Sequence, residues 1–281
     1  MTDPVLVPRD ALAGAKVGIS VSESADLARL GLRPSHCRLA VVELARAVLL
    51  AGGTIVYGGD LRAEGFTTLL LDEVRSYAHG RAALFVCLSA DVHHSLTSAE
   101  VDEIDRRLGT DARLVLVDGD GQSVRPRDRA ARLEPPDSAQ ALTALRRHMT
   151  ELTDARVVVG GRLAGYKGSV PGVVEEALLA IEAGQPVYAA GGFGGAALFV
   201  AGALGADPDL WAPTGVPAGS DDIGAVRGLQ RLEKTIKGLG NPPSDGLDDD
   251  QRKSLAATHR PGEIASLAVL GLSRARIAGS A

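Results

Sequence analysis

The chain is poor in aromatic residues, in cysteine and in net positive charge. Each shortage narrows the kind of core, of site or of binding partner that the protein can have. Only 3% of its 281 residues are aromatic although 45% are hydrophobic, so Ala, Val and Leu have to build the core. Such a core suits helices packed closely on a parallel sheet. Lys and Arg total 30 against 35 for Asp and Glu, a formal net charge of -5. Without a basic excess, neither nucleic acid nor an acidic membrane surface is expected as a partner.

The two cysteines and the N-terminal segment favour a cytoplasmic location. Cys37 and Cys87 show no metal-ligand spacing and are expected to be buried free thiols. The first 16 residues have neither a basic start nor a long apolar core, so no signal peptide is expected there. No run reaches the ~20 apolar residues that a membrane span requires. Nor does the sequence indicate a metal or another cofactor, since its six histidines are scattered.

Short apolar runs alternate with helical patterns along the first 206 residues. Alternating strands and helices joined by short loops predict an α/β fold, a Rossmann-like open parallel sheet with helices on both faces. Loops are expected at residues 89–97 and 118–137. The expected strands are residues 16–21, 54–57, 82–88, 113–117, 155–159 and 186–190. The expected helices are residues 35–51, 66–78, 138–153, 173–183 and 194–204, with another that begins at residue 98.

The pattern changes after residue 206, where helices are expected at residues 221–237, 248–258 and 262–277 without a further strand. We therefore expect a Rossmann-like nucleotide-binding domain at residues 1–206. A helical C-terminal extension at residues 207–281 would pack on that domain or form an oligomer interface.

Glycine-rich turns follow the last two predicted strands, at residues 160–172 and 191–195. Glycine lets the backbone approach a ligand closely, and the first turn of the next helix offers free N–H groups to a phosphate. Because the carboxyl ends of parallel strands meet at one edge of a sheet, the two turns predict a single anion-binding site at that edge.

Polar side chains extend this predicted site. Arg162 and Lys167 are suited to phosphate groups. Glu175 and Glu176 can accept hydrogen bonds from ribose hydroxyls, act on a reacting anomeric carbon, or merely stabilise a helix N-terminus. Phe193 can stack on a base or pack in the core, and Ser22 can line the site or cap a helix. With Glu175 and Glu176 as the candidate catalytic pair, the predicted ligand-binding residues are Ser20, Ser22, Gly58, Gly59, Gly161, Arg162, Tyr166, Lys167, Gly168, Gly191, Gly192, Phe193 and Gly194.

These features resemble the SLOG superfamily. The resemblance covers about residues 16–204. It rests on a serine-bearing first strand, on the Tyr57-Gly58-Gly59 turn and on residues 160–197, GGRLAGYKGSVPGVVEEALLAIEAGQPVYAAGGFGGAA. That superfamily groups Rossmann-like domains of lonely-guy phosphoribohydrolases, of Smf/DprA DNA-processing proteins and of nucleotide sensors. The form Tyr-Lys-Gly-x-x-Pro-Gly-x-x-Glu-Glu is most similar to the branch attached to SIR2 or TIR domains.

The resemblance implies a function and assigns roles to individual residues. Arg162, Lys167 and Glu175 or Glu176 would grip an ADP-ribose-type, NAD-derived ligand, and the protein would act as a sensor. The alternative is a nucleoside 5′-monophosphate N-glycosidase that uses Glu175 or Glu176. Because the sequence retains only part of the lonely-guy motif PGGxGTxxE, as PGVVEE at residues 171–176, binding is favoured over hydrolysis.

Expectations about partners follow from the same resemblance. A homodimer or higher homo-oligomer is expected. About fifteen residues precede the first strand, so we expect either a separate effector chain or no effector. A DNA-processing role like that of Smf/DprA is disfavoured by the acidic balance.

Overall fold

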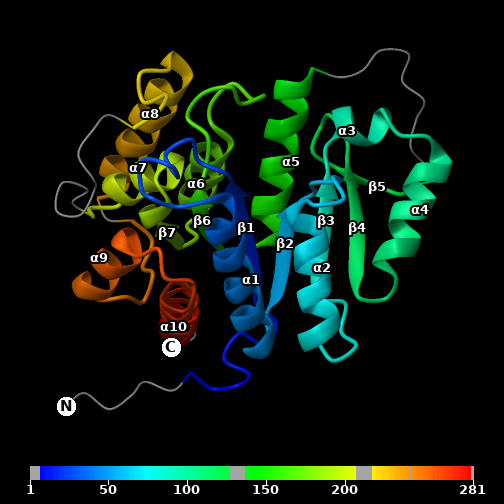
Figure 1. Cartoon of the computed structure of the whole chain (residues 1–281), viewed down its shortest axis with the longest axis horizontal. Coiled ribbons are helices and arrows are strands. Elements are labelled where there is room, and N and C mark those ends of the chain that lie inside the picture. The colour runs from blue at the N-terminus through cyan, green and yellow to red at the C-terminus, as the bar shows by residue number, and fades with distance from the viewer. Residues whose placement is uncertain (1–6, 127–136, 207–216, 241, 280–281) are drawn as a thin grey trace.

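The structure, a computed structural model, describes residues 7–126, 137–206, 217–240 and 242–279 (Figure 1). A seven-stranded sheet lies between two layers of helices, in the strand order β5-β4-β3-β2-β1-β6-β7. Neighbouring strands are parallel except for β4 and β5, which pair antiparallel. The predicted Rossmann-like α/β fold is therefore confirmed.

The elements follow the predicted alternation closely. The strands are β1 (Lys16–Ser22), β2 (Thr54–Gly58), β3 (Leu84–Leu88), β4 (Ala112–Val117), β5 (Ser123–Val124), β6 (Ala155–Gly160) and β7 (Val187–Ala190). The helices are α1 (Pro34–Leu50), α2 (Phe66–Tyr77), α3 (Ala90–His94), α4 (Ser98–Leu108), α5 (Ser138–Leu152), α6 (Gly172–Glu182), the 3-10 turn η2 (Gly191–Phe193), α7 (Gly195–Ala203), α8 (Ile223–Leu239), α9 (Asp249–Ala257) and α10 (Pro261–Gly279).

Two short elements occupy segments where the sequence predicts loops. The five-residue helix α3 lies within residues 89–97, and the two-residue strand β5 lies within residues 118–137. Neither is long enough to show an apolar period, so the pattern that marks the longer elements is absent from both.

The chain reverses its direction across the sheet between β1 and β6. Strands β1 to β4 step outward in sequence order, and β6 then returns to the other side of β1. The register places Ser20 opposite Val158 and Ser22 opposite Gly160. This reversal is a topological switch point, and ligands of open α/β sheets bind in the crevice at the carboxyl ends of the strands there.

The two helical layers bury an aliphatic core on each face of the sheet. Residues of α1, α2, α4 and α10 pack on one face, and residues of α5, α6, α7 and α8 pack on the other. The helices of the predicted extension join these layers, because α10 packs along α1 and α8 packs along α6. The boundary predicted at residue 206 adjoins residues 207–216, which lie outside the described residues, and it stays a prediction.

Cys37 and Cys87 are buried free thiols, as the sequence predicts. Burial raises the pKa of each thiol to about 12. Of the helices that the structure describes, none is both long and apolar enough to span a bilayer.

Candidate functional site

Strand β6 ends at the switch point in two glycines that adopt positive φ angles, 62° at Gly160 and 99° at Gly161. The Gly161 amide donates to the Ser22 carbonyl at 2.8 Å, and the Gly161 carbonyl accepts from the Ala196 amide at 3.1 Å. A Cβ atom on Gly161 would lie 2.8 Å from the Cβ of Ala196. The turn therefore requires glycine and ties the end of β1 to the start of α7.

The loop from Gly161 to α6 carries the two predicted cations. Arg162 and Lys167 are exposed, and neither side chain has an ion-pair partner among the described residues. The Arg162 amide donates to Ser22 Oγ at 3.3 Å. Tyr166 anchors the loop, because its hydroxyl donates to Asp222 Oδ1 at 2.5 Å and Asp222 caps α8. Burial, reinforced by this hydrogen bond, raises the pKa of Tyr166 to about 12.

The N-terminus of α6 lies beside a third, nearly buried cation. No side chain in the described ranges caps this helix, which begins at Gly172. The guanidinium of Arg146, on α5, lies next to this end. A Cβ atom on Gly168 would be 2.9 Å from Arg146 Nη1, and one on Gly172 would be 2.6 Å from Nη2. Both glycines thus leave space for Arg146, which is 9% exposed.

Glu175 balances the charge of Arg146. One oxygen of its carboxylate accepts from Thr143 Oγ1 at 2.6 Å, and the other accepts from Arg146 Nη1. Because Glu175 is only 8% exposed, this pair is nearly closed to solvent. Both carboxylate oxygens are engaged within the protein.

Glu176 pairs with a second buried arginine on β6. Its Oε2 accepts from Ser20 Oγ at 2.5 Å and from Arg156 Nη1 at 2.8 Å. The Arg156 side chain is fully buried, and its desolvation lowers its pKa while Glu176 opposes the shift. Arg156 Nε has no hydrogen-bond partner in the part of the chain that is described. Gly18 makes room for the guanidinium, since a Cβ atom there would lie 2.7 Å from Arg156 Cζ.

Sequence reasoning missed these two arginines. Arg156 lies within the apolar strand run ARVVVG. Because a charge buried in a strand needs a partner, this position could have indicated a buried ion pair. Arg146 lies on a helix with no distinguishing spacing, and only the fold shows that it reaches α6.

The second glycine turn, η2, is packed inside the protein. Phe193 has no exposed surface and belongs to the hydrophobic core, so its ring does not face the sheet edge. Gly191 and Gly192 are buried as well. A Cβ atom on Gly192 would lie 2.2 Å from the carbonyl oxygen of Thr258, which shows that the segment after α9 covers this turn.

A carboxylate of the protein occupies the N-terminus of α7. Asp26, only 1% exposed, accepts from the Gly195 amide at 2.8 Å and from the Ala218 amide at 3.0 Å. A Cβ atom on Gly194 would lie 2.6 Å from the Asp26 Cβ. Of the two predicted phosphate-accepting helix ends, only that of α6 is free of a side-chain cap.

The two glycines at the end of β2, Gly58 and Gly59, lie at the same sheet edge. The Gly59 amide donates to the Cys87 carbonyl at 2.8 Å. Gly58 and Gly59 are half-buried. Asp60, the next residue, is held by Arg62 through contacts of 2.8 and 2.6 Å, and this pairing lowers the pKa of Asp60.

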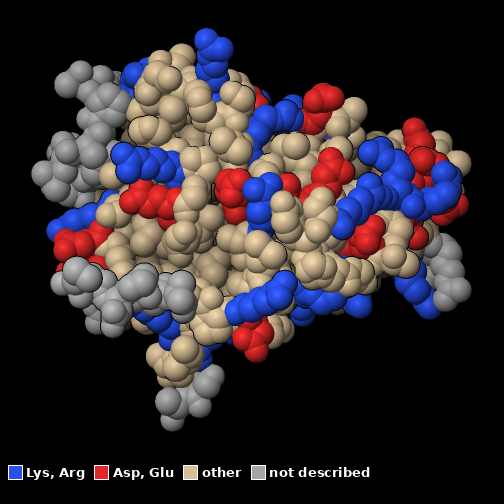
Figure 2. Space-filling view, turned by 60° about the horizontal axis from the view of Figure 1, so that its bottom comes forward, with Lys and Arg blue, Asp and Glu red and all other residues tan. Residues whose placement is uncertain are grey.

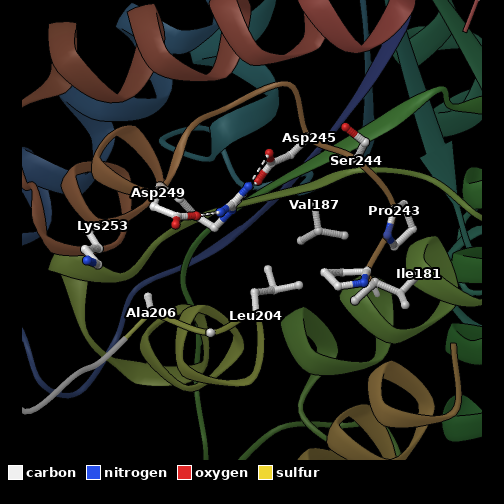
Figure 3. Close-up of a pocket in the computed structure, with 12 residues that line it drawn as sticks. Ile181, Val187, Leu204, Ala206, Pro243, Ser244, Asp245, Asp249 and Lys253 are labelled. Carbon is white, nitrogen blue, oxygen red and sulfur yellow. Dashed lines mark hydrogen bonds and ion pairs between the residues drawn. The ribbon is translucent and has the colours of Figure 1, made fainter. Parts of the chain in front are cut away.

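A cavity of about 460 Å³ lies at the other end of β7 (Figure 3). Its apolar lining includes Val187, the first residue of β7, together with Ile181 and Leu204 near the ends of α6 and α7. Arg252, which also lines the cavity, donates a hydrogen bond to Asp245 at 2.9 Å. Because this cavity adjoins the amino end of β7, it is separate from the site at the switch point.

Charges of both signs are present on the face of the molecule that Figure 2 presents. Figure 2 shows Lys and Arg interspersed with Asp and Glu, without a continuous basic patch on the face that it presents. Among the described residues, no group of three or more His, Cys, Asp or Glu side chains is arranged to hold a metal ion.

The sequence profile of the family described as SLOG cluster2 matches residues 11–227, more than half of the chain. No curated protein matches the chain. The family match points to a nucleotide-related ligand.

Proposed function

The chain belongs to the SLOG superfamily, and we propose that it binds an ADP-ribose-type, NAD-derived nucleotide at the carboxyl edge of its sheet. The switch point between β1 and β6 is the binding crevice, and the protein acts as a sensor of the ligand rather than as a hydrolase.

The observation that carries this proposal is the uncapped N-terminus of α6 surrounded by cations. Arg146 lies beside the first turn, and Arg162 and Lys167 extend from the loop that precedes it. Helix N-terminal amides and these cations suit a phosphate or diphosphate group. Glu175 pairs with Arg146 and Glu176 with Arg156, so the cations of the site without an ion-pair partner among the described residues are Arg162 and Lys167.

Of the two glutamates, Glu176 suits recognition of ribose. Arg156 holds it in place, and a fixed carboxylate is a good acceptor for ribose hydroxyls. Glu176 is the better placed of the two, because 16% of its side chain is exposed and its Oε1 lies 3.9 Å from Arg146 Nε, beyond hydrogen-bond distance.

The same pairing weighs against the N-glycosidase alternative. A carboxylate that acts on a leaving base or on water needs an oxygen free to contact it. Glu175 has both oxygens engaged, by Thr143 and Arg146. Glu176 is therefore the residue on which turnover would depend if the protein were a hydrolase.

As a sensor, the protein needs a route from the ligand to a partner, and we propose that this route is α8. Tyr166 in the binding loop is hydrogen-bonded to Asp222 at the start of α8. The same helix end exposes Ile223 (69%) and Val226 (37%), apolar side chains suited to contact with another copy or with a separate effector chain. Light scattering with and without the ligand would test whether the oligomeric state responds.

Isothermal titration with ADP-ribose, NAD and AMP tests the proposal, combined with chromatography for released base. We expect ADP-ribose to bind without release of base. Lys167→Ala and Arg162→Ala should each weaken binding by about tenfold or more, because a hydrogen bond to a charged group contributes about 1.5–3 kcal/mol. Lys253→Ala is the matched control, because this exposed cation lines the cavity near the amino end of β7.

Two results would contradict the proposal. Failure of all three probes to bind would remove it. Release of base that Glu176→Gln abolishes would replace the sensor with the glycosidase.

A further inference from the structure

Tyr57 lies near the carboxyl end of β2, the strand beside β1 (Figure 1). Its side chain is almost buried, with 6% of the residue exposed. In the part of the chain that the structure describes, the Tyr57 hydroxyl has no hydrogen-bond partner, yet it is not one of the enclosed atoms that lack one. The hydroxyl oxygen therefore keeps a little open surface, where water or a ligand can accept its hydrogen bond.

Tyr57 and Glu176 approach the switch point from opposite faces of the sheet. The Tyr57 ring packs edge-on against Phe66 of α2, with the ring centres 6.5 Å apart, whereas Glu176 belongs to α6 on the other face. Glu176 is hydrogen-bonded to Ser20 of β1, the neighbour of β2. Burial raises the pKa of Tyr57, and the carboxylates of Asp60 and Glu176 are close enough to raise it further. The tyrosine thus stays a hydrogen-bond donor near the Glu176 carboxylate.

A donor and an acceptor on two sides of a crevice match the hydroxyl pair of a ribose. Glu176 Oε1 lies 3.9 Å from Arg146 Nε, beyond hydrogen-bond distance, and makes no hydrogen bond within the described residues. Each ribose hydroxyl can both donate and accept. The 2- and 3-hydroxyls of one ribose can therefore donate to Glu176 and accept from Tyr57.

The ribose lies within reach of a phosphate at the start of α6. Glu176 comes four residues after Gly172, the first residue of that helix, so the two are separated by about 6 Å along the helix axis. Helical side chains also tilt toward the N-terminus, which brings the Glu176 carboxylate nearer to the bound phosphate. A sugar joined directly to that phosphate therefore reaches Glu176 without crossing the sheet.

We propose that Tyr57 and Glu176 together bind the cis-diol of one ribose, so that the protein selects ligands that carry this diol over ligands that lack it. The inference rests on the proposed function, because the phosphate at α6 brings the ribose to Glu176. Tyr57 is then a specificity-determining residue of the same site, and it contacts the ligand through its hydroxyl alone.

Titrations of ADP-ribose and two analogues into matched variants test the inference. In each analogue, hydrogen replaces the diol hydroxyls of one ribose, either the adenosine ribose or the terminal one. We expect one analogue to bind about tenfold or more weakly than ADP-ribose, because it loses a hydrogen bond to a charged carboxylate. Tyr57→Phe removes only the hydroxyl, so it should weaken ADP-ribose by about three- to tenfold and leave that analogue unchanged.

Tyr188→Phe is the matched control. Tyr188 is also buried in the sheet, on β7, but its hydroxyl donates to the Asp245 carbonyl at 2.8 Å. The control should lower the midpoint of urea denaturation and leave the binding of ADP-ribose unchanged. Tyr57→Phe should show the reverse pattern, because among the described residues its hydroxyl has no partner to lose. A structural role for Tyr57 would instead give the pattern of the control.

The outcomes separate this inference from the proposed function. If both analogues bind like ADP-ribose, the diol is not recognised, and the inference is wrong while the proposed function stands. The inference is also overturned if Tyr57→Phe binds ADP-ribose like the original protein, or weakens ADP-ribose and both analogues equally. If the original protein does not bind ADP-ribose, the proposed function fails and the inference fails with it.

Discussion

Replacement of Arg156 by methionine is the sharpest test of the buried charge network. Arg156 is fully buried, and its guanidinium donates to Glu176 at 2.8 Å. Methionine fills much of the same space without a charge. The variant leaves the Glu176 carboxylate with Ser20 as its close partner and Arg146 Nε 3.9 Å from its other oxygen.

The expected loss of stability follows from the burial of the two groups. Removing one partner of a buried ion pair costs about 3–5 kcal/mol, because the other charge remains without compensation. Glu176 keeps 16% of its side chain exposed, so water relieves part of this penalty and the lower end of the range, about 3 kcal/mol, is expected. The double variant Arg156→Met with Glu176→Gln removes the stranded charge and should be more stable than the sum of the two single effects predicts.

Urea denaturation followed by circular dichroism measures these free energies of unfolding. The matched control is Arg231→Met, because Arg231 pairs with another α6 glutamate, Glu182, at 2.9 Å but is 63% exposed. An exposed pair contributes about 0–1 kcal/mol, so this control should change little. Equal effects for Arg156→Met and Arg231→Met, or strict additivity in the double variant, would refute the reasoning.

Three further predictions concern the turn, the loop and the thiols. Gly161→Ala should destabilise the protein by about 1–3 kcal/mol in urea denaturation, because the φ angle is positive and the new Cβ would crowd the turn. Tyr166→Phe removes the hydrogen bond to Asp222 and should lower stability by about 1 kcal/mol while weakening ADP-ribose several-fold in titration. Cys37 and Cys87 keep their protons up to about pH 12 when folded, whereas unfolded thiols ionise near pH 8.5. As the pH rises, the unfolded state therefore loses these protons first. The free energy of unfolding should fall by about 1 kcal/mol per thiol between pH 7.5 and pH 9.5. Substitution of both cysteines by alanine should remove this pH dependence.

The fold could be predicted from the sequence because its signals are local and repeated. Each long element carries its own apolar period, as the helix at residues 34–50 and the apolar run that forms β6 illustrate. The short elements α3 and β5 depend on contacts made elsewhere. The two residues of β5, for example, form a strand because β4 lies beside them.

That the candidate residues gather at one sheet edge could be predicted from the sequence, but the contacts among them could not. Glycines and charges that follow parallel strands predict a group of polar residues at the carboxyl edge of the sheet. In the structure, Ser20 contacts Glu176 and the Arg162 amide contacts Ser22, although these residues are far apart in the sequence. The partners of the two glutamates could not be deduced from spacing, because Arg146 comes from another helix and contacts Glu175 only once both helices pack on the same face.

The difference between the two glycine turns shows why spacing cannot assign a binding role by itself. Both turns follow parallel strands and both open helices, so their local sequences predict the same phosphate-accepting geometry. At α7 the Asp26 carboxylate already accepts from the Gly195 amide and neutralises the positive end of the helix dipole, and Asp26 lies 169 residues earlier in the chain. At α6 the first turn carries Glu175, which pairs with Arg146, and Arg162 and Lys167 on the preceding loop have no ion-pair partner among the described residues. A bound anion would therefore be repelled by Asp26 at α7 and attracted at α6, so the assignment of the phosphate to α6 depends on a residue that neither turn contains.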